Sequence, residues 1–436
     1  MERKAYASLL KWKSSSDRKP LILQGARQVG KTWLMKEFGQ REYERTAYFD
    51  FERTKELHGI FSKGYDTGRI LSALNILAGF EIRPESTLIV LDEIQSCPEA
   101  ITSLKYFRDE TPSQSLIAAG SLLGVAMHGG FSFPVGKVDF LTLHPLGFEE
   151  YLAAIGQEPM IKALVNPEPS FADLFRDSLT EMLKRYLFVG GMPEAVADFA
   201  SNGSFERVRS IQQAILTAYE NDFSKHAPTT SLPRIRMVWR SIVGQLAKEN
   251  AKFIYSLMRT GARAKEFELA LEWLRDAGLI HKVHRISKPG LPVQAYADWS
   301  DFKVYLNDTG LLCAMADLPL GILLKDNDLF TEFKGRLTEQ FVLQQMVCEQ
   351  MPPFYWNPDM GISEVDFVIQ SGDKVVPVEV KASTNLRSKS LRVYHDRYRP
   401  ELCIRTSLAE HRKQDWLENI PLYGLQHWLR RFSSGS

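Results

Sequence analysis

The sequence has few cysteines and no long apolar run, and both features limit what the protein can be. Its four cysteines, Cys97, Cys313, Cys348 and Cys403, lie far apart and show neither CxxC spacing nor a histidine at zinc-ligand distance. They predict neither a disulfide framework nor a zinc site. No run of about 18 uncharged apolar residues is present, and the first residues lack an apolar segment of signal-peptide length. We therefore expect a cytoplasmic protein that is neither exported nor membrane-spanning.

The chain also has almost no net charge. Its 54 Lys and Arg residues balance 53 Asp and Glu residues, so the total charge by itself predicts nothing about partners. Basic residues outnumber acidic ones from Lys381 onward, which suits contact with phosphates and equally an ordinary solvated surface. With 44% apolar residues over a length of 436, the chain is typical of a soluble globular protein. One core usually holds no more than about 250 to 300 residues, so we expect two to four domains.

The first half of the chain predicts an α/β domain followed by helices. From Leu21 to Gly120, short apolar runs alternate with longer segments of helical period; the runs are LILQ, TAYFDF, TLIVLD and SLIAAG. This alternation predicts buried parallel strands connected by helices, and we assign residues 1–147 to that domain. Amphipathic segments then predict a helical lid over residues 148–228.

Two further domains are expected after the turn-rich segment HAPTTSLP. Residues 229–320 contain three helical candidates and then two alternating segments around KPGLP, a pattern typical of a winged helix-turn-helix. Residues 321–436 contain the helical segment GRLTEQFVLQQMVCEQ and two strand candidates, VDFVIQ and VVPVEVKA, separated by SGDK. We expect this last part to be a second α/β domain.

The segment LILQGARQVGKTWLMKEF predicts a phosphate-binding loop. Gly25, Gly30, Lys31 and Thr32 fit every fixed position of GxxxxGK[ST], between an apolar strand and a helix. The glycines let the backbone curl around phosphate oxygens, Lys31 reaches the β- and γ-phosphates, and the Thr32 hydroxyl completes a Mg²⁺ shell. The residues expected to contact the nucleotide are Gly25, Ala26, Arg27, Gln28, Val29, Gly30, Lys31, Thr32 and Trp33.

Two later strands predict the rest of that site. Asp92, at the end of TLIVLD, is placed to hold a metal-bound water, and Glu93 is placed to orient and polarise the attacking water. Gln95 fits a contact to the γ-phosphate, to the next domain or a plain helix cap. Ser121, after SLIAAG, fits either a γ-phosphate sensor or ordinary Gly-Ser turn chemistry.

Several ordered motifs carry a resemblance to a known family. GARQVGKT, LDEIQSCPE, AAGSLLG, FPVGKVDFLTLHPLGFEEYL and GGMPEAV together resemble the AAA-family P-loop ATPases of bacteria and archaea that carry a C-terminal domain of unknown function 4143. The resemblance covers nearly the whole chain. It implies an AAA-type nucleotide domain that uses ATP and Mg²⁺, with Asp92 and Glu93 as metal and catalytic acids and Ser121 near the polar sensor position.

The chain departs from the family pattern at one position. Relatives usually have Gly-Arg where this chain has Gly136-Lys137, and an arginine there would act as a finger on a neighbour's γ-phosphate. Lysine keeps the charge but loses the planar bidentate fork. Either Lys137 performs a weaker version of that role, or the finger lies elsewhere. A site completed by a neighbour makes a homo-oligomer plausible, and a monomer stays open.

The C-terminal strands predict a second acidic site. Asp366 and Glu379 lie on strands joined by a tight turn, and Glu379 and Lys381 share one face of a strand. Two carboxylates, with Glu339 from the preceding helix as a third, would hold Mg²⁺, and Lys381 would orient a hydroxide that attacks a phosphodiester. This arrangement resembles the PD-(D/E)XK nuclease superfamily. A fold that binds nucleic acid without cleaving it, or a surface ion pair between Glu379 and Lys381, stays open.

The predicted winged helix adds basic residues that suit DNA phosphates. They are Arg259, Arg263, Lys265, Arg275, Lys282, Arg285 and Lys288. Acidic residues in the same helix argue against deep groove insertion, so packing between domains is an alternative. We therefore expect an ATPase that couples its nucleotide cycle to DNA binding, with Mg²⁺-dependent cleavage open. The alternative is a nucleotide-gated regulatory protein that assembles with a partner protein and has an inactive nuclease-like domain.

Overall fold

A computed structural model of the chain describes residues 2–120, 134–166, 168–248, 252–324, 331–358, 363–384 and 387–434. Contacts within the chain divide it into two compact units. One consists of Glu2–His144 with Asp276–Leu279, and the other of Pro145–Arg275 with Ile280–Ser436. Among the described residues, we find no helix with the length and apolarity that a membrane crossing requires.

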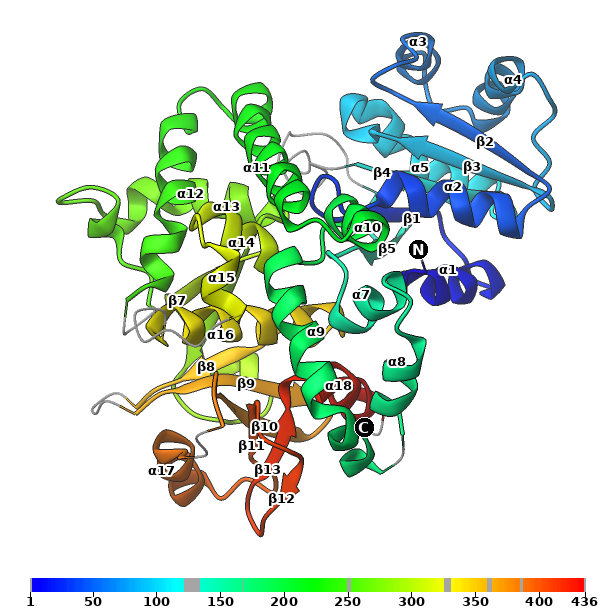
Figure 1. Cartoon of the computed structure of the whole chain (residues 1–436). Coiled ribbons are helices and arrows are strands. Elements are labelled where there is room, and N and C mark those ends of the chain that lie inside the picture. The colour runs from blue at the N-terminus through cyan, green and yellow to red at the C-terminus, as the bar shows by residue number, and fades with distance from the viewer. Residues whose placement is uncertain are drawn as a thin grey trace. The chain divides into compact units, whose positions relative to one another are not determined.

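The N-terminal unit is built on a parallel sheet with the strand order β2-β3-β4-β1-β5 among the described residues (Figure 1). The strands are β1 (Leu21–Gln24), β2 (Arg45–Asp50), β3 (Thr87–Asp92), β4 (Ser115–Ala119) and β5 (Asp139–Thr142). The helices are α1 (Ala5–Ser14), α2 (Lys31–Glu42), α3 (Glu56–Ser62), α4 (Thr67–Ala78) and α5 (Pro98–Glu110). The parallel α/β domain that the alternating pattern predicts is confirmed.

The apolar runs of the sequence form the centre of this sheet. All six residues of β3 are buried, as are all five of β4, which is why both read as continuous apolar segments rather than alternating ones. Asp66 caps the start of α4 by accepting a hydrogen bond from the Arg69 amide, and Gly79 ends the helix in the left-handed conformation. Because all strands are parallel, their carboxyl ends share one edge, which carries Gln24, Asp50 and Asp92.

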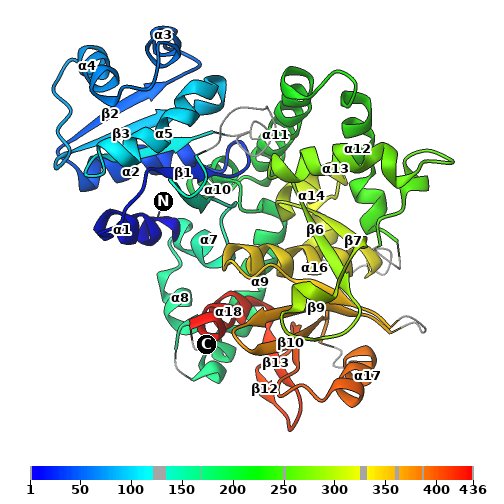
Figure 2. The same ribbon diagram turned by 180° about the vertical axis from the view of Figure 1, so that it is seen from behind.

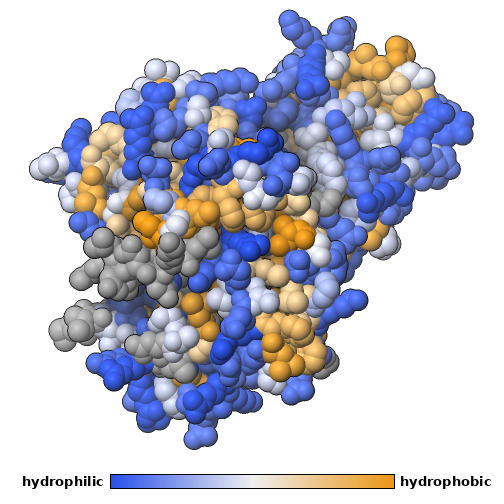
Figure 3. Space-filling model, in the orientation of Figure 1, coloured by the Kyte–Doolittle hydropathy of each residue, from blue (hydrophilic) through white to orange (hydrophobic). Residues whose placement is uncertain are grey.

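Parts of this unit's surface are apolar. Apolar side chains gather over the end that carries α3 and α4 (Figure 3), where the Ile76 side chain is 81% exposed and Leu77 is 39% exposed. Single exposed apolar residues are normal on soluble proteins, so we draw nothing further from this region.

The second unit begins with helices and contains a mixed sheet. Its helices are α7 (Phe148–Ala154), α8 (Glu158–Leu164), α9 (Arg176–Val189), α10 (Pro193–Asn202), α11 (Phe205–His226), α12 (Leu232–Leu246), α13 (Ala264–Asp276), α14 (Thr309–Met315), α15 (Leu320–Leu324), α16 (Thr331–Cys348), α17 (Lys389–Tyr398) and α18 (Leu425–Ser434). Its strands are β6 (Ile280–Ile286), β7 (Ala297–Leu306), β8 (Phe354–Trp356), β9 (Val365–Ser371), β10 (Lys374–Val380), β11 (Ile404–Ser407), β12 (Arg412–Lys413) and β13 (Glu418–Pro421).

All the described strands of this unit belong to one sheet with the order β12-β13-β11-β10-β9-β8-β6-β7. The β6–β7 hairpin, expected as the wing, joins the C-terminal strands because β6 pairs with β8 in parallel. The predicted boundary between residues 320 and 321 therefore falls inside a continuous sheet, whereas contacts divide the chain after His144. The division into four domains stays a prediction.

Figure 2 shows the course of α16 from behind. Buried glutamines of this helix form hydrogen bonds with segments that pack around it. Gln345 accepts a 2.9 Å hydrogen bond from the Phe148 amide at the start of α7, and Gln344 donates to Asp308 at 3.1 Å. Asp308 in turn accepts a 2.5 Å hydrogen bond from the Gly191 amide in GGMPEAV. Because buried amides and carboxylates are costly without partners, this network fixes the helical segment against α16.

Candidate nucleotide site and C-terminal acidic cluster

The loop between β1 and α2 has backbone conformations that require glycine. Gly25 has a φ of 141° and Gly30 a φ of 93°, both in the region that side chains disfavour. A Cβ atom on Gly25 would also lie 2.1 Å from the Leu143 carbonyl oxygen. Gln28 has a positive φ of 67° as well, so the loop curls tightly before α2 begins at Lys31. The strand, loop and helix predicted from GxxxxGK[ST] are all present.

The Lys31 side chain is folded back into this loop. It is 7% exposed, and its Nζ donates hydrogen bonds of 2.8 Å to both the Gly25 and Ala26 carbonyl oxygens. Burial lowers the pKa of Lys31 to about 8, although the Glu93 and Asp92 carboxylates oppose that shift. The ammonium is therefore held close to two acids at the carboxyl edge of the sheet.

Asp92 is the centre of the predicted metal site. It is 2% exposed, and its Oδ2 accepts 2.7 Å hydrogen bonds from the Thr32 and Tyr48 hydroxyls. A hydroxyl and a carboxylate in direct contact, at a helix start, are the donor set that holds Mg²⁺ beside a triphosphate, so Thr32 and Asp92 fit the ion. The sequence analysis missed Tyr48. The sequence could have indicated Tyr48, because it lies near the carboxyl end of β2, the strand adjacent to β3.

Glu93 and Gln95 form a pair next to that centre. Glu93 has a left-handed φ of 51°, and its amide donates a 3.0 Å hydrogen bond to Asp92 Oδ1. Gln95 Nε2 donates to Glu93 Oε2 at 2.5 Å, while Gln95 Oε1 is buried without a hydrogen-bond partner among the described residues. The Gln95 side chain thus holds the Glu93 carboxylate, and the contact expected between Gln95 and the γ-phosphate stays a prediction.

Arg3 ties the start of the chain to the phosphate loop, and the sequence analysis missed it. Its Nη1 donates to the Val29 carbonyl oxygen at 2.9 Å, and its Nη2 donates to the His144 carbonyl oxygen at 2.6 Å. Burial, reinforced by the Arg3 charge, lowers the pKa of His144 to about 4. No local sequence pattern indicates a contact that spans 141 residues.

Three other residues were predicted to belong to this site, namely Ser121, Trp33 and Lys137. Ser121 falls outside the described residues. The Trp33 side chain is 43% exposed, so a large part of it faces solvent. Lys137 comes two residues before β5 and forms a 2.6 Å ion pair with Asp109. Because β5 is parallel to β1, Lys137 lies at the amino edge of the sheet, about 13 Å of strand away from the phosphate loop.

The C-terminal acids also meet, on β9 and β10. These strands are antiparallel with Phe367 paired to Val378, which places Asp366 beside Glu379. Asp366 Oδ2 accepts a 2.7 Å hydrogen bond from the Val380 amide. Glu379 forms a 2.6 Å ion pair with Lys381, so the ion pair that the sequence analysis left open is present.

Glu339 approaches the same place from α16. It accepts hydrogen bonds from the Tyr305 hydroxyl at 3.1 Å and from Arg336 Nη1 at 2.7 Å. Burial, together with the nearby Glu339 charge, raises the pKa of Asp366 to about 8. The charges of both other predicted acids, Glu339 and Glu379, therefore act on Asp366.

A lysine that the sequence analysis missed completes this cluster. Lys303, on β7, is 0% exposed and forms an ion pair with Glu364. Burial works against its charge, but Glu364, Glu339 and Asp366 outweigh burial and raise the pKa of Lys303. In the described part of the chain, no three Asp, Glu, His or Cys side chains gather in a way that could hold a metal ion. A buried ammonium therefore lies beside the acids that the sequence analysis assigned to a metal ion, and that assignment stays a prediction.

The expected DNA-contacting residues separate into two groups. Arg259 pairs with Glu266 at 2.7 Å, and Arg275 and Lys282 both pair with Glu272. Their charges are largely satisfied within the protein, in line with the alternative of packing.

Arg263 and Lys265 lie differently. With Arg234 and the 74% exposed Leu269, they line a hollow of about 410 Å³ beside the starts of α12 and α13. Its one acidic residue, Glu266, is already paired with Arg259. This hollow therefore has a surplus of positive charge.

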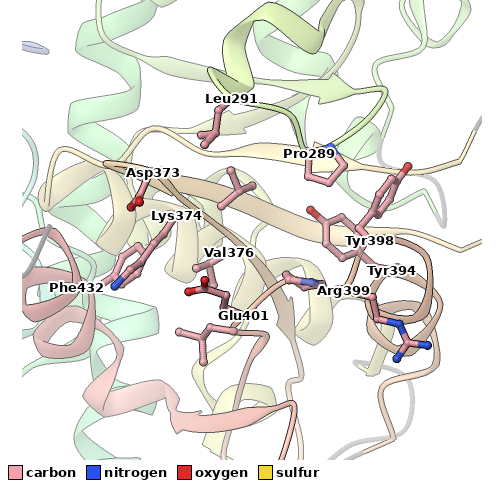
Figure 4. Close-up of a pocket in the computed structure, with 13 residues that line it drawn as sticks. Pro289, Leu291, Asp373, Lys374, Val376, Tyr394, Tyr398, Arg399, Glu401 and Phe432 are labelled. Atoms are coloured by element: carbon pink, nitrogen blue, oxygen red, sulfur yellow. The ribbon is translucent and has the colours of Figure 1, made fainter.

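A second hollow, of about 440 Å³, is lined by none of the residues of the acidic cluster (Figure 4). The β6–β7 loop contributes Pro289 and Leu291 to it, and α17 contributes Tyr398. Its charged lining is mixed, since Lys374, Arg399, Asp373 and Glu401 all border it. The balance of signs favours no particular class of ligand.

Comparisons with known proteins agree with the nucleotide site. The family model of the AAA domain matches residues 17–152. Two domains of unknown function follow, DUF8612 over residues 180–321 and DUF4143 over residues 334–425. No curated protein matches the chain.

Three solved structures resemble the chain at low identity. A Walker-type ATPase of Pyrococcus abyssi is 16% identical, over 72% of this chain and 95% of that chain, with a TM-score of 0.44. The Orc1 protein of Aeropyrum pernix, solved in complex with DNA, is 14% identical over 74% and 95%, with a TM-score of 0.30. A chain of the Drosophila ORC bound to DNA is 14% identical over 72% and 93%, with a TM-score of 0.26.

The family matches and the phosphate-loop geometry lead to one assignment. The AAA match contains β1, the loop, α2 and β3, and the DUF4143 match contains most of α16 and the strands β8 to β13. The chain therefore carries an AAA domain at residues 17–152 and the domain of unknown function 4143 at residues 334–425.

Proposed function

We propose that the chain binds ATP with Mg²⁺ and hydrolyses the γ-phosphate. The observation that carries this proposal is the Thr32–Asp92 hydrogen bond at the start of α2, directly after a loop that only glycines at 25 and 30 allow. Thr32 and Asp92 would hold the ion, and Mg²⁺ would supply positive charge to the phosphate oxygens.

Lys31 changes partners when the triphosphate binds. Its ammonium, now bonded to two loop carbonyls, would donate instead to phosphate oxygens, which carry full negative charge and form stronger bonds. Burial has lowered its pKa to about 8, and contact with the negatively charged phosphates opposes that shift and favours the charged form.

Glu93 orients the attacking water. Its carboxylate lies next to Asp92 and is held by Gln95, so one oxygen has a fixed direction before the substrate arrives. Gln95 acts as a positioning residue for Glu93.

Substitutions separate the two roles. Lys31→Ala removes phosphate contact, and we expect calorimetry with Mg-ATP to show at least a tenfold loss of affinity. Glu93→Gln keeps the shape but not the base, so nucleotide should still bind while turnover falls about 100-fold or more. Wild-type turnover in either variant would overturn the proposal.

We also propose that the unit containing α12 and α13, with the winged-helix order of elements, contacts DNA phosphates. What supports this is the hollow lined by Arg234, Arg263 and Lys265, in which cationic side chains outnumber the single, already paired acid. Exposed Leu269 between them suits a sugar or base edge. DNA binding would be coupled to the nucleotide cycle.

Salt dependence tests the DNA contact. The double variant Arg263→Ala/Lys265→Ala should weaken binding to duplex DNA and reduce the slope of log K against log salt by about 2. Arg275→Ala is the matched control, because Arg275 is paired with Glu272 and should leave that slope unchanged. Equal slopes in the wild type and the double variant would contradict the proposal.

A homo-oligomer is part of the same proposal. Lys137 lies at the sheet edge opposite its own phosphate loop, so it could reach a γ-phosphate only in another copy. Mass measurement with a slowly hydrolysed ATP analogue tests this, with the apo protein as the reference. A monomer under both conditions would remove Lys137 from the catalytic set.

A further inference from the structure

The buried Lys303 side chain has a position that the nucleotide-coupled function does not use. It comes from β7, the outer strand of the hairpin, and has 0% exposure. Its ammonium pairs with Glu364 and lies 4.8 Å from the centre of the Tyr355 ring. An ammonium is strongly hydrated in water, so its complete burial requires full compensation by nearby groups.

The compensation comes from the acidic cluster. Lys303 interacts electrostatically with Glu364, Glu339 and Asp366. Glu339 is shared with Arg336, and Glu379 with Lys381. The cluster thus holds four acids and four cations; the acids are Glu339, Glu364, Asp366 and Glu379, and the cations are Lys303, Arg336, Lys381 and Arg405, which interacts with Glu379.

This balance leaves little room for a divalent ion. Every acid of the cluster already has an internal partner, since Asp366 accepts the Val380 amide and Glu379 also accepts the Leu391 amide at 3.3 Å. A divalent cation bound by the same oxygens would have to share them with a buried ammonium of like charge. Repulsion between two such cations is strong where water is excluded.

We propose that the Lys303 ammonium is the resident cation of the acidic cluster and takes the place of the divalent metal ion there. The cluster is then an internal charge network that holds the β6–β7 hairpin to β9 and α16. It follows that the DUF4143 part of this chain has no Mg²⁺-dependent phosphodiester cleavage.

Manganese titration tests this proposal, with electron paramagnetic resonance to count bound Mn²⁺. The wild type and Asp366→Asn should bind the same number of ions, because the nucleotide site is common to both. Lys303→Met should bind one additional Mn²⁺, and Lys303→Met/Asp366→Asn should lose it again. One Mn²⁺ more in the wild type than in Asp366→Asn would overturn the proposal, as would no gain in folded Lys303→Met.

Thermal melting covers the case in which Lys303→Met is poorly folded. Millimolar Mn²⁺ should then raise its melting temperature by about 5 °C more than that of the wild type, because the ion replaces the lost charge. Equal shifts in both proteins would contradict the idea. Lys252→Met is the matched control, since Lys252 forms a 2.6 Å pair with Asp301 at a half-exposed position in the same unit.

Two further measurements separate this inference from the proposed function. Lys31→Ala should abolish ATP turnover and leave the Mn²⁺ count at the cluster unchanged. Plasmid DNA should stay intact with the wild type in Mg²⁺ or Mn²⁺, with or without ATP. Nicking that Asp366→Ala removes would overturn the inference even if the ATPase proposal holds.

Discussion

Tyr48 and Thr32 donate to the same oxygen of Asp92, each at 2.7 Å. The two hydroxyls come from β2 and α2, so two separate elements orient the Asp92 carboxylate before any ligand binds. Thr32 has to turn toward the metal ion when the nucleotide binds, and Tyr48 is then the donor that keeps Asp92 oriented. Burial, with the Asp92 hydrogen bond, raises the pKa of Tyr48, so the hydroxyl stays protonated at neutral pH.

Tyr48→Phe should therefore weaken the response to magnesium. We expect the Mg²⁺ concentration for half-maximal ATPase to rise about tenfold, because a lost outer partner loosens a metal-binding carboxylate. Nucleotide affinity without Mg²⁺ should change little. Tyr65→Phe is a suitable control, because Tyr65 stacks on Tyr106 in the same unit. An identical magnesium dependence in Tyr48→Phe and the wild type would argue against the role of Tyr48.

Arg3→Ala should destabilise the phosphate loop. The substitution leaves the Val29 and His144 carbonyl oxygens without their donor, at a cost of about 1–3 kcal/mol in unfolding free energy. Urea unfolding measures that cost, and calorimetry with Mg-ATP should show weaker binding. Lys11→Ala, at an exposed position of α1, should have no effect on either quantity.

His144 predicts a loss of stability on acidification. Its pKa falls from an ordinary 6.5 to about 4 in the folded chain, so between these values the unfolded chain binds the extra proton. The contribution of His144 to the free energy of unfolding is complete above pH 6.5 and declines as the pH falls toward 4. At pH 5 the loss should be about 2 kcal/mol. Urea unfolding at pH 7.5 and pH 5 should show a smaller difference in His144→Gln than in the wild type.

Gly191→Ala should disrupt the connection between the helices and α16. A Cβ there would lie 2.1 Å from the Leu146 carbonyl oxygen, so the backbone would have to move and break the Asp308 hydrogen bond. We expect a loss of about 2–4 kcal/mol in unfolding free energy. Gly244→Ala in α12 is the matched control, because nothing lies within 4 Å of its Cβ, and it should stabilise by about 0.5–1 kcal/mol.

The local parts of the nucleotide site could be predicted from the sequence. The motif residues Gly25, Gly30, Lys31 and Thr32 lie close together in the chain, so their fixed spacing was enough to predict the phosphate-binding loop. Asp92 ends a buried strand, and the apolar run before it was enough to predict its position. The parallel direction of the strands in the first sheet could also be predicted, because strands and helices alternate along the sequence.

The residues that were missed share a different property. Arg3 contacts His144 across 141 positions, and Lys303 meets Glu364 across 61. Neither lies in a motif, because each acts through a partner that only the folded chain brings close. A lysine on an alternating strand is normally solvent-facing, and nothing local distinguishes Lys303 from such a residue.

The continuous sheet has a consequence for dissecting the chain. A fragment that starts at residue 321 would keep β8 but lose β6, its parallel neighbour, and would expose a row of unsatisfied backbone groups along β8. The same cut would also remove Lys303 and leave the Glu364 carboxylate without its ion-pair partner. Such a piece would tend to aggregate, and inactivity measured on it would say nothing about the intact molecule.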